Sequence, residues 1–86
     1  MTYQLTVTLG FSPSAIMEDP SHEEKEILSL VEVVEEEELS GGLENYIGTK
    51  VRLSSPSADN ILKFLQRTEE FSKEDLVSLM SEVEIV

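Results

Sequence analysis

The chain has 86 residues, of which 18 are acidic and 6 are basic, so its formal net charge at pH 7 is −12. A small body this acidic repels DNA, RNA and anionic membrane surfaces, because all three carry dense negative charge. The absence of cysteine excludes disulfide bonds, thiolate metal sites and a nucleophilic thiol. No apolar stretch approaches the ~20 residues that cross a bilayer, so we expect one domain over residues 1–86, located in the cytoplasm.

Residues 2–10 predict a first strand, because apolar and polar side chains alternate there and Gly10 ends the pattern. Its core-facing residues are Tyr3, Leu5, Val7 and Leu9. Residues 11–20 contain two prolines and predict a connecting loop. We expect that loop to anchor Phe11, Ile16 or Met17 on the core.

Residues 21–39 allow two interpretations. Ser21 and Glu24 have the spacing of a capping box, which predicts a helix beginning there. Apolar side chains continue at helical spacing, at Ile27, Leu30, Val31 and Val34. The same stretch is also a short apolar run rich in β-branched residues, which is typical of a strand. The segment is therefore predicted as helix or strand, and it ends before the Ser40-Gly41-Gly42 break.

The second half of the chain predicts a strand followed by two helices. Residues 46–54 indicate a strand with a turn or bulge at Gly48, and Lys50 and Arg52 lie on its solvent face. Residues 57–68 predict a helix capped by Ser57, with Ala58, Ile61, Leu62 and Leu65 on one face.

Residues 72–83 predict another helix, with a capping box at Ser72 and Asp75 and an apolar stripe of Leu76, Leu79, Met80 and Val83. The last residues form either a closing strand or the frayed end of this helix. Together the elements predict an α+β fold in which a small two- or three-stranded antiparallel sheet is packed by two or three short helices.

Acidic residues are concentrated between positions 18 and 44, where eleven carboxylates accompany one cation. The densest run is Glu35 to Glu38, which has no evident structural role and, at the C-terminal end of a helix, would oppose the helix dipole. Carboxylates three or four residues apart on a helix lie about 5–6 Å apart, near the spacing of phosphates along a nucleic-acid strand. Glu32, Glu35 and Glu36 have this spacing, as do Glu23 and Glu26.

We therefore interpret the acids as a partner-binding surface. Its main residues are Glu32, Glu35, Glu36, Glu37 and Glu38, with Glu23, Glu24 and Glu26 as a second cluster. Apolar anchors beside them are expected at Leu39, Leu43 or Tyr46.

Catalysis and metal binding find little support in the sequence. His22 is the single histidine and follows a capping serine, and no phosphate-binding loop or calcium-binding loop is present. We expect no enzymatic activity, no cofactor and no metal. The basic residues Lys50, Arg52, Lys63 and Arg67 are expected to pair with acidic neighbours or to contact acidic groups of a partner.

The C-terminal part of the chain resembles small acidic anti-CRISPR proteins of phages that inhibit Cas9. The resemblance lies in the order of Val51-Arg52-Leu53-Ser54-Ser55, Asn60-Ile61-Leu62-Lys63-Phe64-Leu65, Glu69-Glu70-Phe71 and the capped segment to Val86. It implies a short sheet followed by two helices, and acidic residues that occupy the DNA-binding cleft of the nuclease. It includes no diagnostic motif, and this chain differs in beginning with a strand and in placing its acidic block before the middle. Contact residues of the family are therefore not transferred to this chain.

The predicted function is stoichiometric inhibition by polyanion mimicry, in which the acidic segment occupies a basic nucleic-acid-binding groove of a protein. The expected partner is thus a basic protein, with no direct binding to nucleic acid or membrane. The alternative is a non-catalytic adaptor or small subunit of a larger assembly, which would bind through a mainly apolar interface. The sequence leaves the oligomeric state open.

Overall fold

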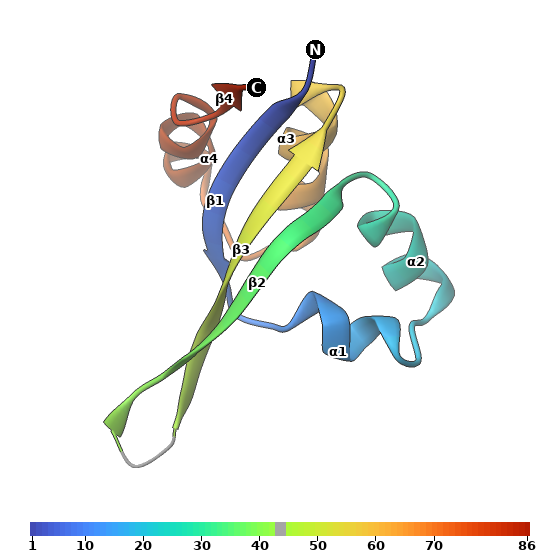
Figure 1. Cartoon of the computed structure of the whole chain (residues 1–86), viewed down its shortest axis with the longest axis vertical. Helices are drawn as coiled ribbons and strands as arrows, with labels where there is room; N and C mark the ends of the chain where they lie inside the picture. Colours follow the sequence, from blue (N-terminus) through green and yellow to red (C-terminus); the bar gives the residue numbers. More distant parts are fainter. Residues whose placement is uncertain (43–44) are drawn as a thin grey trace.

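The computed structural model describes residues 1–42 and 45–86, and in these residues it contains four strands and four short helices (Figure 1). In chain order they are β1 (Tyr3–Leu9), α1 (Pro13–Met17), α2 (His22–Leu28), β2 (Glu32–Ser40), β3 (Tyr46–Ser55), α3 (Ala58–Arg67), α4 (Lys73–Met80) and β4 (Glu84–Ile85). The α+β class is confirmed. The predicted numbers of strands and helices were too low, because the fold adds the short elements α1 and β4 and divides residues 21–39 into two.

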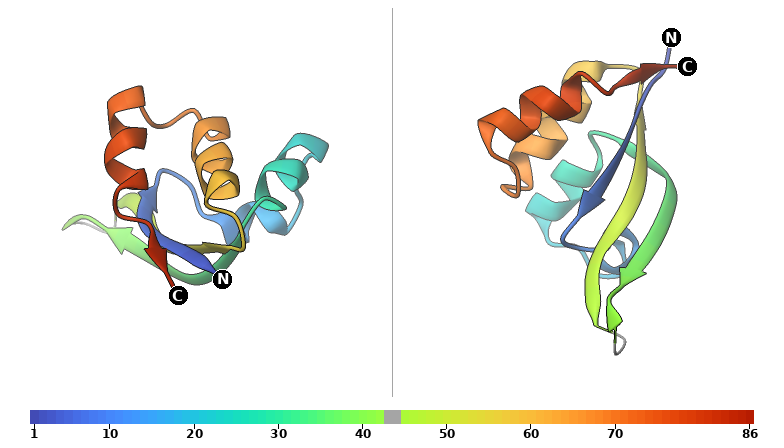
Figure 2. Two further views of the ribbon diagram at one scale, coloured as in Figure 1. Left: turned by 90° about the horizontal axis from the view of Figure 1, so that it is seen from above. Right: turned by 90° about the vertical axis from the view of Figure 1, so that its left-hand side faces the viewer.

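The strands form one antiparallel sheet in the order β2-β3-β1-β4. The helices gather on one side of this sheet, and the opposite face carries no helix from the described residues (Figure 2). Alternation along β1 and β3 turns their apolar residues toward the helices, as predicted. The buried core consists of Leu5, Val7, Leu9, Val51, Leu53, Ile61, Phe64 and Leu65.

Residues 21–39 form a helix and then a strand, so the prediction of a single element was wrong. The capping box is present: the Ser21 Oγ accepts from the Glu24 N–H at 3.1 Å, and the Glu24 carboxylate accepts from the Ser21 N–H at 2.8 Å. The helix ends at Leu28, and from Glu32 the chain pairs with β3. Capping is local, whereas strand pairing depends on β3 and is decided only by tertiary structure.

Residues 11–20 are not wholly a loop, because α1 occupies Pro13–Met17. Ser12 caps this helix and Pro13 stands at its first position, where the missing N–H costs nothing. Phe11 packs against the core as expected and Ile16 is half-buried. Met17, another expected anchor, is instead 57% exposed.

The strand over residues 46–55 contains the expected irregularity. Leu39 pairs with Gly48 and Ser40 with Tyr46, so Ile47 is an extra residue beside Gly48. Gly48 has φ of 156°, and a Cβ there would lie 3.1 Å from the Leu9 carbonyl oxygen. The close approach of β1 therefore requires glycine at this position.

Helices α3 and α4 follow the predicted order with shorter bounds. Ser57 is the N-cap residue of α3, as predicted, but its side chain makes no capping hydrogen bond. Phe64 is fully buried, although the predicted apolar face omitted it. The capping box of Ser72 and Asp75 is confirmed, and the predicted stripe of α4 packs on the core.

The open question about the chain end is settled by β4. Its residues Glu84 and Ile85 pair with Gln4 and Tyr3 of β1. The last residues therefore form a closing strand, which places the C-terminus beside the N-terminus (Figure 1).

Candidate functional site

Glu35, Glu36, Glu37 and Glu38, here called the acidic run, lie on β2 at the edge of the sheet (Figure 1). All four residues are exposed. Among the described strands β2 is paired with β3 alone, and the hairpin that these two strands form projects away from the helices. The acidic run is thus on an extended edge strand and not on a helix.

Alternation along β2 sends the acidic run to two faces of the sheet. Glu35 pairs with Arg52 and Glu37 with Lys50, so these four charged residues share the helix-free face. The Glu35 carboxylate lies 3.9 Å from the Arg52 Nε. A shallow hollow of about 500 Å³ runs between these side chains and Thr6 of β1. Positive and negative charges therefore partly balance on this face.

Glu36 and Glu38 pair with Val51 and Thr49, which places them on the side of the sheet that carries the helices. The Glu36 Oε1 accepts from the Ser14 N–H at 3.1 Å, at the first turn of α1. It also lies 3.4 Å from the Ser12 hydroxyl, which donates to it. A carboxylate is favourable at a helix N-terminus, where N–H groups lack partners.

These contacts and the strand conformation of β2 correct three expectations about the acidic residues. Glu36 has a structural role, because it ties α1 to β2. The run also does not oppose a helix dipole, since it is not at a helix C-terminus. The helical spacing proposed for Glu32, Glu35 and Glu36 was wrong for the same reason. On the strand, Glu32 and Glu35 pair with Ser54 and Arg52, which are two residues apart on β3, so they lie about 7 Å apart along the sheet.

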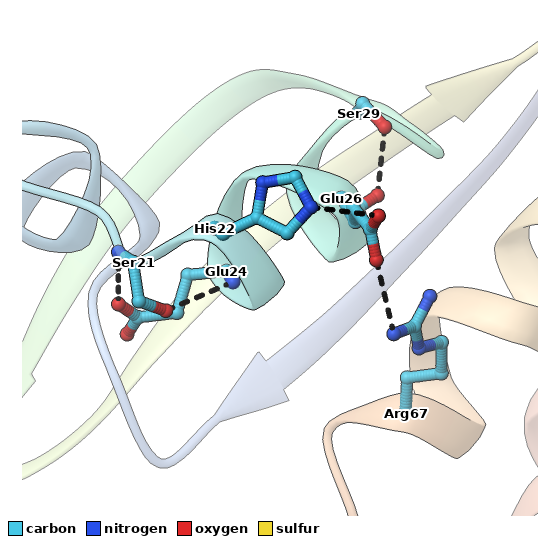
Figure 3. A network of polar contacts seen from close by, with 6 residues as sticks. All are labelled: Ser21, His22, Glu24, Glu26, Ser29 and Arg67. Atoms are coloured by element: carbon cyan, nitrogen blue, oxygen red, sulfur yellow. Dashed lines mark hydrogen bonds and ion pairs between the residues drawn. The ribbon is translucent and has the colours of Figure 1, made fainter.

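The second acidic cluster lies on α2 and is largely occupied by contacts within the chain (Figure 3). Glu24 closes the capping box with Ser21. The Glu26 carboxylate lies 3.3 Å from the His22 Nε2 and 3.7 Å from the Arg67 guanidinium of α3. Glu23 is exposed. Glu24 and Glu26 therefore stabilise the fold locally, whatever else they bind.

The projecting end of the hairpin carries apolar side chains. Tyr46 is 44% exposed and Ile47 is 64% exposed, while Leu39 is half-buried. The Tyr46 hydroxyl lies 2.6 Å from the Thr49 Oγ1, which orients the ring. Leu43, another expected anchor, lies outside the described residues. Ile47 was not predicted as a partner-binding residue. Its position beside Gly48, where the strand bulges, is the sequence feature that could have indicated its exposure.

Pairing of the basic residues with acidic neighbours is confirmed for Arg52, Lys63 and Arg67. Their partners are Glu35, Asp59 and Glu26. All of these side chains are well exposed, so each pair contributes at most about 1 kcal/mol.

In residues 1–42 and 45–86, no three or more histidine, aspartate or glutamate side chains are grouped so as to hold a metal ion. Nor do these ranges contain a helix with the length and apolar character needed to cross a membrane. Comparison with known proteins found no matching family model, no matching curated protein and no matching solved structure.

Proposed function

We propose that this chain is a non-catalytic inhibitor that inserts its β2–β3 hairpin into a basic nucleic-acid-binding groove of a target protein. The acidic run would take the place of nucleic-acid phosphates there. We expect both the inhibitor and its target to be located in the cytoplasm of the cell in which the inhibitor is made. The resemblance to anti-CRISPR proteins makes Cas9 nucleases the first targets to assay.

The spacing of charges on β2 is the observation that carries this proposal. An antiparallel strand rises about 3.4 Å per residue, so Glu35 to Glu38 present one carboxylate per 3.4 Å of length. One strand of B-DNA presents one phosphate charge per 3.4 Å of axis. The match concerns the spacing along the axis and not the direction of the side chains. Successive glutamates of the acidic run alternate between the two faces of the sheet.

The members of the acidic run should not contribute equally. Glu35 and Glu36 already contact Arg52 and Ser14 within the chain. Glu37 and Glu38 lie nearer the projecting end of the hairpin and appear in none of the ion pairs formed by the described residues. Binding should therefore depend most on Glu37 and Glu38.

The test begins with capture of the target from lysate at several salt concentrations, followed by competition with fluorescent DNA for the purified target. Glu37→Lys with Glu38→Lys is expected to lower the inhibition more than tenfold. The matched control is Glu74→Lys with Glu82→Lys, which changes the net charge equally at exposed sites outside β2. Equal inhibition by both double variants would refute the proposal.

An adaptor function is the second candidate, and the exposed apolar side chains at the hairpin end favour it. Ile47 and Tyr46 would then supply the binding energy, because burying an exposed isoleucine contributes about 1.5–3 kcal/mol. Binding through this tip should persist in 1 M NaCl and be lost in Ile47→Ser. Polyanion mimicry predicts the reverse pattern, since salt screens exposed charges.

A further inference from the structure

A second hollow lies between α1, α2 and the outer side of β2, next to the acidic run. It measures about 440 Å³, within the range of small-molecule and side-chain pockets. Its apolar walls come from all three elements: Pro13, Met17, Leu28, Val31, Val33 and Val34. This hollow adjoins the shallow hollow on the helix-free face, and the two share Glu35 and Glu36 in their linings.

The hollow exposes apolar side chains that the fold does not bury. Met17 is 57% exposed and Val34 is 40% exposed, whereas Leu28, Val31 and Val33 are partly buried against the core. Val34 is the extra residue at the register shift between Val33 and Glu35. Bulges commonly redirect a side chain away from the ladder, and here the redirected side chain lines the hollow.

Hydrogen bonds hold the wall that α1 contributes. The Ser14 N–H and the Ser12 hydroxyl both donate to the Glu36 carboxylate, so the first turn of α1 is fixed to β2. Helices α1 and α2 also contact each other. Because this wall is already fixed, binding need not order it, which lowers the entropic cost of binding.

Charge around the hollow selects the occupant. Glu35 and Glu36 line it from β2, and Glu18 and Asp19 directly follow Met17 at the end of α1. An apolar segment with acidic flanks would be repelled, and a neutral one would gain nothing from these carboxylates. A segment with cations beside an apolar side chain satisfies both the walls and the rim.

We propose that this hollow is a specificity pocket, which receives one leucine- or methionine-sized side chain from a lysine- or arginine-rich segment of the target. This inference rests on the proposed function and adds to it. Charge on β2 would supply attraction to many basic surfaces, and the hollow would supply the discrimination among them.

The probe is a short peptide with one leucine flanked on both sides by lysines. Two matched peptides replace the leucine by serine or the lysines by glycines. Binding is followed by methyl NMR of Met17, Leu28 and Val34, together with titration. We expect the leucine–lysine peptide to shift these methyl signals and to bind about tenfold tighter than either matched peptide.

Met17→Ser and Val34→Thr should each remove most of the tenfold preference for the leucine peptide over the serine peptide. Both side chains are exposed, so the variants should fold, which unfolding midpoints verify. Val77→Thr is the matched control, because Val77 is 73% exposed on α4, away from the hollow.

Three results would overturn the specificity pocket. The first is that the leucine and serine peptides bind within twofold of each other. The second is that the lysine-free peptide binds as tightly as the basic one. The third is that the methyl signals shift with protein concentration alone, which would mean that a second copy fills the hollow. Polyanion mimicry is judged separately by DNA competition with the Glu37 and Glu38 variants. If the peptides fail these tests while inhibition is intact, only the specificity pocket is refuted, and polyanion mimicry stands.

Discussion

Glu36 provides the sharpest test of how the acidic run is built into the fold. Replacing Glu36 by alanine removes the acceptor of the Ser14 N–H at the first turn of α1. Loss of a helix N-terminal acceptor costs about 0.5–2 kcal/mol, typically about 1. Removing one of several neighbouring negative charges relieves repulsion and raises the free energy of unfolding by about a few tenths of a kcal/mol. The net expectation is a loss of about 0.5–1 kcal/mol in the free energy of unfolding.

Glu38→Ala is the matched control for this change. Glu38 lies on the same face of β2 two residues away, and it makes no hydrogen bond to α1 among the described residues. Its removal relieves the same repulsion without losing an acceptor, so stability should be unchanged or should rise slightly. The rise should vanish at high salt, because screening removes the repulsion in both proteins.

The assay is urea unfolding followed by far-UV circular dichroism, since the chain has no tryptophan. With a urea dependence of about 1 kcal/mol per M for so small a domain, the midpoint of Glu36→Ala should fall by about 0.5–1 M. The midpoint of Glu38→Ala should not fall. Equal shifts in the two variants would show that Glu36 acts only as one more surface charge, and the structural role assigned to it would be wrong.

Three further variants test the fold. Phe64→Ala removes a fully buried ring and should cost about 3–5 kcal/mol, enough to abolish cooperative thermal unfolding of a small domain. Glu69 has φ of 59°, so Glu69→Gly should raise the free energy of unfolding by about 0.5–1 kcal/mol, while Glu69→Gln, which changes only the charge, should not. Gly48→Ala would place a Cβ near the backbone of Leu9 and should cost about 1–3 kcal/mol. Gly42→Ala, where no atom of residues 1–42 or 45–86 meets the added Cβ within 4 Å, should be nearly neutral by the same urea assay.

Local signals in the sequence predicted the element ends well. The capping boxes at Ser21 and Ser72 and the alternation of β1 all recur in the structure. Each depends on residues within a few positions of one another, so nearby chemistry is sufficient to specify them. Ser57 is the exception, because its sequence pattern was right for a cap while its side chain makes no capping bond.

The candidate site was predicted in its residues but not in its geometry. The charge of the acidic run is fixed by the amino-acid sequence, and its exposure follows from four consecutive glutamates. The conformation of the acidic run is not fixed by the amino-acid sequence around it, because the apolar run before it fits both a helix and a strand. The helical spacing of Glu32, Glu35 and Glu36 was therefore a wrong inference from a real charge pattern.

The sequence by itself determined the α+β class, the acidic character and the places where α2, α3 and α4 begin, but not the short helix α1. Only the tertiary structure decided that residues 32–40 are a strand, since β2 exists through its pairing with β3. That pairing turns Glu35 and Glu37 toward Arg52 and Lys50 and turns Glu36 toward α1. Strand pairing joins residues that are distant in sequence, and its free energy comes from contacts that no local pattern contains.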